Sequence, residues 1–381
     1  MPILIKNKSE CTGCGACFNK CPHKCIEMKE DDCGFIYPQV DNSKCTNCEL
    51  CVKVCPLKNE LKSENTIKSV YASWSKNPKT RMTSTSGGVF SELAYGIIAM
   101  GGAVSGAVYD SENNICHTLV YKQKDILRIR QSKYAQSNIC DTFMRIKNEL
   151  KSKPVLFCGT PCQTAGLISF LGGHPDKLFT VDFICRGVNS PKAYREWLKE
   201  LEENKNSKVS RVWFKYKQDG WKKSPKCTRI DFEDKTHIVQ KGTDNTFMCG
   251  YLGANLYIRK SCGNCKFKGE KRFGDITVGD FWGIDRQYDD DRGTSLVLIN
   301  SKHGEELFEN IKSKLFIVER KKEEILGGNV CFNNSVNINP ESENFLRSLG
   351  NGIPFSRLVR NYTKVSLTVR AKRCIKRIIK K

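Results

Sequence analysis

Eight cysteines near the start of the chain fall into two runs with the same spacing. Residues 11–22 read CTGCGACFNKCP and residues 45–56 read CTNCELCVKVCP, so C-x2-C-x2-C-x3-C-P occurs twice. Three cysteines at two-residue intervals wrap one corner of an iron–sulfur cube, and the fourth leaves the loop to bind the other cluster. The pattern predicts two 4Fe-4S clusters, which carry electrons. The predicted ligands are Cys11, Cys14, Cys17 and Cys55 for the first cluster, and Cys45, Cys48, Cys51 and Cys21 for the second.

A pair of zinc sites is the alternative to two clusters, because C-x2-C is also a zinc signature. Zinc needs four ligands per site and usually separates its cysteine pairs by longer loops. Two complete four-cysteine runs that each end in Cys-Pro therefore favour clusters. Cys25 and Cys33 fall outside both runs and are interpreted as spectators.

A third group of cysteines lies further along the chain. Cys262 and Cys265 form a C-x2-C pair that is two ligands short of a site. A further iron–sulfur cluster, redox-active thiols and plain buried cysteines all fit this pair. The cysteines that could complete a site are Cys158, Cys162, Cys185 and Cys249. The five histidines are scattered and are expected at the surface, and no His–Asp or paired-carboxylate pattern indicates a catalytic acid.

Two glycine-containing junctions between a strand and a helix could bind phosphate. TSTSGGVFSELA (83–94) leads into a helix, and LFCGTPCQTAG (156–166) joins a buried strand to another helix. At such junctions free N–H groups and the helix dipole point the same way, and glycine lets an anion approach the backbone. Neither stretch matches G-x-G-x-x-G or the P-loop pattern. Ordinary helix capping by Ser and Thr is the alternative explanation for each junction. Because two such junctions occur in a chain that also carries cluster motifs, a phosphate-bearing cofactor is as well supported as capping.

The elements that position these residues alternate between strands and helices, which predicts an α/β body. Strands are expected at 70–74, 103–109, 154–159, 178–185, 274–284 and 295–300, and helices at 87–101, 141–152, 160–173, 190–204 and 302–314. Residues 207–241 look like short antiparallel strands, and residues 245–258 could be helical. The predicted fold class is α+β or α/β, a small two-cluster ferredoxin-like module followed by a mixed α/β body.

The domain organisation follows from these elements and from changes in composition. Residues 1–60 form the two-cluster module, and a polar linker precedes the body. The body has an N-terminal part at 68–150 and a C-terminal part at 151–330, and residues 331–381 are a basic C-terminal tail. A length of 381 residues with 39% hydrophobic residues suits two or three domains with an ordinary core.

Cysteine usage indicates a reducing compartment. The chain has 21 cysteines, an odd number, and its first residues, MPILIKNKSE, lack the apolar run of a signal peptide. Cluster ligands must be thiolates, which a secreted disulfide scaffold would not supply. No segment approaches the roughly 20 apolar residues that span a bilayer. We therefore expect a cytoplasmic protein.

Half of the net charge of +22 comes from the end of the chain. Residues 344–381 hold 11 Lys and Arg residues and no Asp or Glu, so the rest of the chain is only mildly basic and no nucleic-acid groove is indicated. The last stretch, KVSLTVRAKRCIKRIIKK (364–381), places apolar residues at helical spacing among basic ones. Such a helix can lie on an anionic membrane surface, here the inner face. The alternatives are a helix packed on the body and a disordered solubilising tail.

Taken in order, these motifs resemble one known family. The cysteine runs, TSGGVFSELA, VLFCGTPCQTAG, DFICRGVNSP and SCGNCKFKGEKRFGDITVGDFWG follow one another as in the beta-subunit family of coenzyme F-420 hydrogenases and dehydrogenases. The resemblance covers roughly residues 1–330 and implies a flavoprotein, with FAD in the α/β body near iron–sulfur clusters. By this analogy the residues that contact FAD are Thr85, Ser86, Gly87, Gly88, Gly159, Thr160, Pro161, Cys162 and Gln163. Cys185, Cys262 and Cys265 would lie near the flavin or an additional cluster.

The resemblance implies an iron–sulfur flavoprotein oxidoreductase. A flavin joins two-electron substrates to one-electron clusters. Electrons would pass between a ferredoxin-like partner, the two clusters, FAD and a two-electron substrate, for which a deazaflavin is one candidate. The alternative is an electron-relay subunit that has no substrate of its own and serves a catalytic redox subunit.

Overall fold

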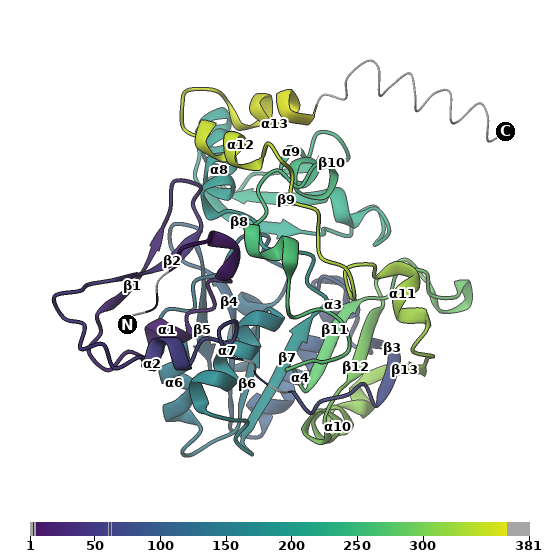
Figure 1. The fold of residues 1–381 in the computed structure, drawn as a ribbon. Coiled ribbons are helices and arrows are strands. Elements are labelled where there is room, and N and C mark those ends of the chain that lie inside the picture. Colours follow the sequence, from purple (N-terminus) through teal and green to yellow (C-terminus); the bar gives the residue numbers. More distant parts are fainter. Residues whose placement is uncertain (1–2, 4, 60, 62, 364–381) are drawn as a thin grey trace, which may run out of the picture.

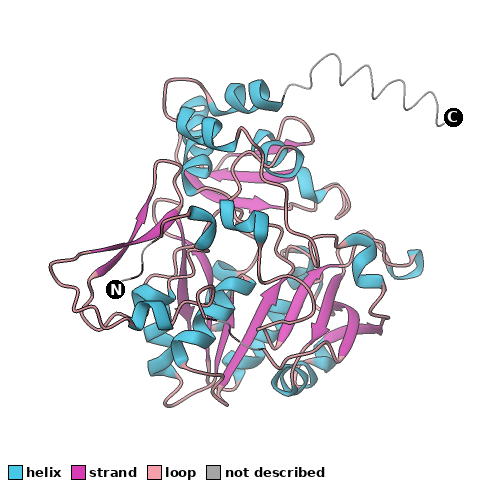
Figure 2. Ribbon diagram, in the orientation of Figure 1, coloured by secondary structure: helices cyan, strands magenta, loops and turns pink. Residues whose placement is uncertain are grey.

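The computed structural model describes residues 3, 5–59, 61 and 63–363. The predicted membrane-surface helix at 364–381 lies outside these residues. Figure 1 shows the N-terminal module at the left, a large sheet below, and a smaller sheet covered by helices at the top. Figure 2 shows helices packed along the large sheet and around the small one. The mixed α/β fold class, with a ferredoxin-like module in front, is therefore confirmed.

The N-terminal module, residues 5–59, is held together by a hairpin and two short helices. Strands β1 (Ile26–Glu30) and β2 (Ile36–Val40) pair antiparallel, with Ile26 opposite Val40. Helices α1 (Ala16–Lys20) and α2 (Leu50–Lys53) each follow the first cysteines of one run. Both begin after a residue with left-handed backbone, Gly15 and Glu49, which turns the chain sharply enough for neighbouring cysteines to face one point.

The large sheet of the described residues has eight strands in the order β13-β3-β12-β11-β7-β6-β4-β5. Its centre, β4-β6-β7-β11, is parallel, and the remaining pairs are antiparallel. The strands are β3 (Ser69–Ser75), β4 (Ala103–Tyr109), β5 (Ile115–Val120), β6 (Val155–Cys158), β7 (Leu178–Phe183), β11 (Ile276–Asp280), β12 (Ser295–Ile299) and β13 (Leu315–Glu319). Since ligands of open α/β sheets bind beyond the carboxyl ends of parallel strands, this centre indicates where a site should lie.

Alternate residues of the central strands serve the two faces of the sheet. Leu156 of β6 faces the core of helices α4 (Val89–Ala99) and α10 (Lys302–Glu309). Its neighbours Val155 and Phe157 face the core that helices α6 (Thr142–Glu149) and α7 (Pro161–Leu171) share with the N-terminal module. Short helices α3 (Pro78–Met82), α5 (Ile126–Ile129) and α11 (Glu324–Gly328) complete the body. The module therefore packs directly on one face of the sheet.

A small antiparallel sheet forms a second, aromatic core. Its strands β8 (Val209–Phe214), β9 (Cys227–Phe232) and β10 (His237–Lys241) run in the order β10-β9-β8. Helices α8 (Pro191–Lys205), α9 (Thr246–Met248), α12 (Ser342–Ser348) and α13 (Phe355–Thr363) surround it. Trp197 of α8 stacks on Phe247 at 4.9 Å between ring centroids. The described part of the predicted tail thus packs on this core through Phe355 and Leu358.

The predicted strands and helices of the body are confirmed within a few residues, with one difference. The helix expected at 245–258 is limited to α9 and a five-residue π-helix, Cys249–Gly253. Buried Asn245 begins α9 by accepting a hydrogen bond from the Met248 N–H. Ala254 and Asn255 then leave helical geometry, and Asn255 adopts a positive φ of 55°. The chain thereby turns toward the buried segment 256–258.

A His–Asp pair holds the amino ends of two central strands together. His174 lies 2.9 Å from Asp275, whose carboxylate also accepts hydrogen bonds from Thr180 and Ser301. Burial lowers the pKa of His174, but the hydrogen bond and charge of Asp275 outweigh it, so the pKa is raised. The expectation of surface histidines without a His–Asp pair is therefore wrong for His174, because the two residues are brought together only by the sheet.

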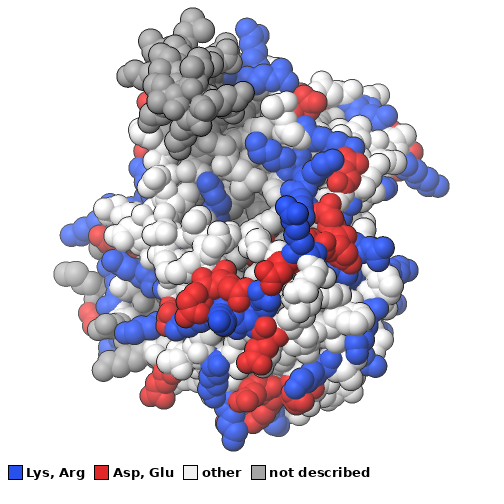
Figure 3. Space-filling model, turned by 90° about the vertical axis from the view of Figure 1, so that its right-hand side faces the viewer, with Lys and Arg blue, Asp and Glu red and all other residues white. Residues whose placement is uncertain are grey.

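The charges at the surface are mixed in sign. On the face shown in Figure 3, Lys and Arg side chains lie beside Asp and Glu side chains. Surface ion pairs in the described residues include Lys222–Asp289 and Lys322–Glu270. No described helix is both long and apolar enough to cross a membrane.

The aromatic core predicts the effect of removing Trp197, which is 1% exposed. We expect Trp197→Ala to lower the free energy of unfolding by about 3–5 kcal/mol, because the cavity left by a buried aromatic ring is only partly refilled. Urea unfolding followed by circular dichroism under anaerobic conditions measures this loss. Met100→Ala, at a side chain that is 51% exposed, is the control and should change stability by less than about 0.5 kcal/mol.

The His174–Asp275 pair predicts a pH dependence of stability. The pKa of His174 is higher in the folded protein than the 6.5 of an unperturbed histidine in the unfolded chain, so the charged pair stabilises the fold fully below pH 6.5. This contribution is lost as the pH rises through the folded-state pKa. His174→Gln should therefore cost about 1.5 kcal/mol at pH 6 and clearly less at pH 9, where Asp275 remains ionised. An equal loss at both pH values in urea titrations would show that the pair is not charged.

Candidate functional site

The four predicted ligands of the first cluster surround one small cavity. Cys11, Cys14, Cys17 and Cys55 all line it. The Gly13 N–H donates to the Cys11 sulfur at 3.3 Å, as backbone amides do around cluster sulfurs. Burial raises the pKa of the Cys14 thiol to about 12, so a thiolate here needs a cationic partner, which iron supplies. The residues present therefore fit a cluster.

The second cavity is lined by five cysteines rather than four. The predicted ligands Cys21, Cys45, Cys48 and Cys51 line it together with Cys25. The Cys25 sulfur lies 3.3 Å from that of Cys21. Cys25, interpreted as a spectator, therefore lies against the second site, because the turn after Cys21 folds it back toward the predicted ligands. Cys33 lies in the aromatic core instead.

The cysteine sulfurs are spread more widely than a single zinc ion requires. In the described part of the chain, no three cysteine sulfurs lie within 4.8 Å of one another. Sulfurs at about 2.3 Å from one tetrahedral zinc ion would be about 3.8 Å apart.

Arg259 joins the N-terminal module to the body. Its guanidinium is fully buried and donates to the carbonyls of Cys11 at 2.8 Å and Ile36 at 3.1 Å. It also donates to the Gln136 side chain at 2.9 Å and lies over the Tyr37 ring. A Cβ at Gly13, whose φ is +71°, would collide with Gln136. Module and body therefore meet without a gap beside the first cavity.

A third group of cysteines surrounds another small cavity next to the first. Its members are Cys162, Cys185, Cys262, Cys265 and Cys331. Thr12, between two ligands of the first run, lines both cavities. The predicted grouping of Cys185 with Cys262 and Cys265 is thus seen in space. Cys331 was missed because no motif surrounds it, and Cys249 lies elsewhere, with its thiol directed at the Gly242 carbonyl.

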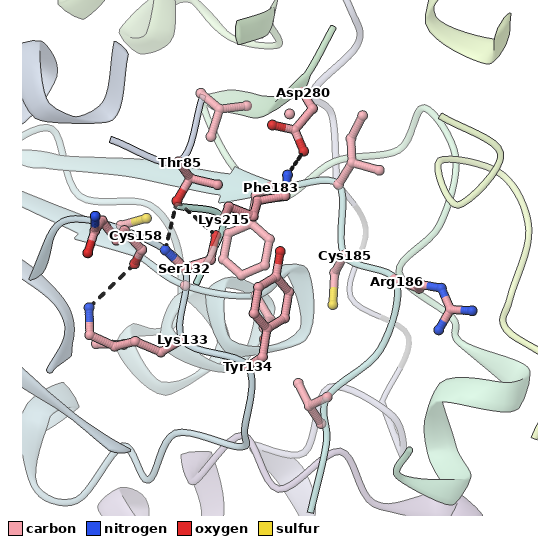
Figure 4. Close-up of a pocket in the computed structure, with 18 of the residues that line it drawn as sticks. Thr85, Ser132, Lys133, Tyr134, Cys158, Phe183, Cys185, Arg186, Lys215 and Asp280 are labelled. Atoms are coloured by element: carbon pink, nitrogen blue, oxygen red, sulfur yellow. Dashed lines mark hydrogen bonds and ion pairs between the residues drawn. The ribbon is translucent and has the colours of Figure 1, made fainter. Parts of the chain in front are cut away.

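A cavity of about 500 Å³ opens at the carboxyl ends of β6, β7 and β11. Its walls include residues 12–13, 84–86, 129–137, 158–160, 183–189 and 278–280. Both glycine-containing junctions border it, through Thr85, Ser86, Gly88, Gly159, Thr160, Cys162 and Gln163. Gly87 lies behind the wall, where its N–H donates to Ser295, and Pro161 lines the third cysteine cavity. Figure 4 shows Thr85, Cys158, Phe183 and Cys185 gathered around this space.

The two junctions differ in how their helices begin. Helix α7 has a capping box in which Thr160 and Gln163 satisfy each other's backbone amides, so ordinary capping explains its hydroxyl and amide side chains. Helix α4 follows Gly88, whose φ is +90°, and has no side-chain cap. The amino end of α4 therefore remains available to an anion in the cavity.

Two cations, Arg130 beside the first turn of α4 and Lys133, lie in the same wall of the cavity. Arg130 donates to Ser91, Thr83 and Tyr95 and has no carboxylate partner among the described residues. Lys133 donates to the carbonyls of Arg130 and Gln131, and burial lowers its pKa to about 7. Figure 4 shows Lys133 beside Cys158 at one side of the cavity. This wall is therefore electropositive and suited to an anionic group.

Three further groups in the cavity wall escaped sequence analysis. His117 is 4% exposed, and burial lowers its pKa to about 4. The ring is therefore neutral, and since the Cys158 carbonyl can only accept, Nε2 donates to it while Nδ1 accepts from Ser137. Its expected surface position is wrong, since β5 points it inward. Lys215 and Asp280 form an ion pair across the cavity wall. No short motif marks these three residues, so only the fold brings them together.

Comparison with known proteins agrees with the cysteine pattern and the body. Residues 10–59 match the 4Fe-4S dicluster domain, and residues 152–324 match the C terminus of the coenzyme F420 hydrogenase/dehydrogenase beta subunit. No curated protein matches the sequence. A chain of the xenon-derivatised F420-reducing NiFe hydrogenase complex from Methanosarcina barkeri is 15% identical, with a TM-score of 0.46, over 80% of this chain and 91% of that chain. A likeness of this degree carries no functional inference.

The resemblance predicted from the motifs is confirmed by the two matched segments. Iron–sulfur chemistry follows from the first segment, and electron transfer of an oxidoreductase from both. Residues 152–324 thus match the C-terminal part of the coenzyme F420 hydrogenase/dehydrogenase beta-subunit family, and they follow a 4Fe-4S dicluster domain at residues 10–59.

Proposed function

We propose that the protein is an iron–sulfur flavoprotein oxidoreductase that binds FAD in the 500 Å³ cavity. The observation that carries this proposal is the position of the cavity. Thr12 and Gly13 of the first cysteine run border it on one side, and Cys162, Cys185 and Cys331 of the third group on another. A cofactor in this space would be next to both groups of thiols.

The residues of the cavity fit the two ends of FAD. The uncapped start of α4, Arg130 and Lys133 would hold the diphosphate, because neither Arg130 nor Lys133 forms an ion pair with a described carboxylate. Tyr134, Phe183 and Trp282 supply flat apolar surface for a ring system. A bound flavin exchanges two electrons with a substrate and single electrons with clusters.

We further propose an additional iron–sulfur cluster in the third cysteine cavity. Cys162, Cys185, Cys262 and Cys265 would be its ligands, and Cys331 is the alternative fourth thiol. Lys268 donates to the carbonyls of Cys185 and Cys331, which fixes the two segments that carry these cysteines. A cluster here would lie next to both the first cluster and the flavin.

The order of the sites suggests a path for the electrons. The second cluster is furthest from the cavity, and its ligand Cys48 is exposed. A ferredoxin-like partner, or a catalytic redox subunit, would exchange electrons there. The cavity leaves room for a two-electron substrate at the flavin, and a deazaflavin is one candidate. A cytoplasmic location and a membrane contact through residues 364–381 stay predictions.

An electron-relay subunit without its own substrate is the competing function. Anaerobic purification followed by quantification of iron, sulfide and flavin separates the two. We expect one FAD per chain and about twelve irons, of which about eight belong to the N-terminal module. If the protein contains iron but no flavin, even after reconstitution with FAD, the result supports the relay function instead.

The third cysteine group predicts a selective loss of iron. Replacing both Cys262 and Cys265 by Ser should lower the iron content by about four atoms per chain, because a 4Fe-4S cluster loses two of its four ligands. Cys249→Ser is the matched control, since this cysteine lies outside the cavity, and it should leave the iron content unchanged. Unchanged iron in the double variant would refute the additional cluster.

Lys133 predicts a pH-dependent affinity for FAD. The ammonium form attracts the diphosphate, and it is lost as the pH rises through about 7, the pKa of Lys133 in the cavity. FAD binding to the wild-type protein should therefore weaken between pH 6 and pH 8. Lys133→Met should weaken binding about tenfold at pH 6 and flatten this dependence. Exposed Lys124, replaced by Met, is the control in the same flavin-fluorescence titration.

A further inference from the structure

Lys215 and Asp280 form a buried ion pair in the wall of the large cavity. Their side chains are 6% and 16% exposed, and both residues line the cavity. Figure 4 shows the pair joined across the top of the space, with Tyr134 and Phe183 below it. Neither residue takes part in the cysteine groups or in the cationic wall near α4.

Two different parts of the fold bring the pair together. Asp280 is the last residue of β11, and its carbonyl accepts a hydrogen bond from Asn329. Lys215 directly follows β8 of the small sheet and has a φ of +55°. A left-handed backbone is unfavourable for lysine and is kept only where the surroundings enforce it. The turn after β8 therefore directs this ammonium into the cavity.

The pair leaves hydrogen-bonding capacity unused. The Oδ1 atom of Asp280 is buried and has no partner among the described residues. The Lys215 ammonium has Asp280 as its one recorded acceptor there, although it carries three N–H groups. Nearby Lys217 is different, because its ammonium donates to the carbonyls of Arg81, Ser86 and Arg292. The protein thus supplies three acceptors for the Lys217 ammonium, whereas the described residues supply one acceptor for Lys215 and no donor for Asp280 Oδ1.

We propose that Lys215 and Asp280 bind the edge of a planar ring that carries a carbonyl next to an N–H, as in a cyclic imide or lactam. Lys215 donates to the ring carbonyl, and Asp280 Oδ1 accepts from the ring N–H. Trp282, which stacks on Trp221 at 4.3 Å and 7°, borders the same part of the cavity and offers aromatic surface to such a ring.

This inference rests on the proposed function for the source of the ring. The same chemistry occurs in the pyrimidine edge of FAD and in a two-electron substrate with an imide edge. Two binding measurements on cluster-loaded protein separate these sources. The first compares FAD with 3-methyl-FAD, which lacks the ring N–H. The second compares lumazine, a free ring with an imide edge, with 3-methyllumazine on protein already supplied with FAD.

We expect the wild-type protein to bind the unmethylated ring about tenfold more tightly in one of the two measurements. Asp280→Ala should abolish this preference, whereas Lys215→Met should weaken the binding of both rings, because the carbonyl that Lys215 would contact is present in each. Exposed Lys322, which pairs with Glu270, is the matched control, and Lys322→Met should keep it. Unchanged iron content shows that each variant is folded, and Asp280→Asn supplies a second variant of the same shape.

Each outcome has one meaning. Preference for FAD over 3-methyl-FAD assigns the pair to the flavin, and preference for lumazine assigns it to the substrate. Equal binding of methylated and unmethylated rings in both measurements, or a preference that survives in Asp280→Ala, overturns the inference. If FAD does not bind at all, the proposed function fails, and the lumazine measurement on the cluster-loaded protein still decides the role of the pair.

Discussion

The buried guanidinium of Arg259 is the interaction on which the arrangement of the sites depends. It has no carboxylate partner among the described residues and instead donates to backbone carbonyls of Cys11 and Ile36, which belong to the N-terminal module. Hydrogen bonds and a nearby aromatic face lower the cost of burying this charge: each of its three nitrogens donates one hydrogen bond, and the Tyr37 ring lies 4.1 Å away. Because one of these carbonyls belongs to a predicted cluster ligand, the same contact sets the place of the first cluster beside the large cavity.

The parallel centre of the sheet explains why so much chemistry gathers at one edge. Strands β6, β7 and β11 end at Cys158, Phe183 and Asp280, and all three residues line the large cavity. The small antiparallel sheet contributes Lys215 from the opposite side. The first and third cysteine groups and an electropositive wall thus border one space, although their residues are distributed over most of the chain.

Local spacing made part of this site predictable. The paired cysteine runs and the Cys262–Cys265 pair are short motifs, and strand or helix periodicity located the elements between them. Contacts between distant segments left no such signal. Arg259 meets Cys11 across 248 positions, and the carboxylate partner of Lys215 lies 65 positions away. Cys25 and Cys331 join their groups through turns whose shape depends on tertiary packing. The sequence suggested helix capping as an alternative to phosphate binding at both junctions. Only the structure shows that Thr160 and Gln163 cap α7 whereas the start of α4 has no side-chain cap.

Two glycines of the N-terminal module bear on whether that module can be exchanged. A Cβ at Gly13 would collide with Gln136, and a Cβ at Gly34 would collide with Lys192. Both glycines also have positive φ, 71° and 78°, which other residues rarely adopt. A transplanted two-cluster domain that kept all eight cysteines but lacked these glycines could still hold its metal, yet its backbone would lie further from the body and pass electrons to it more slowly.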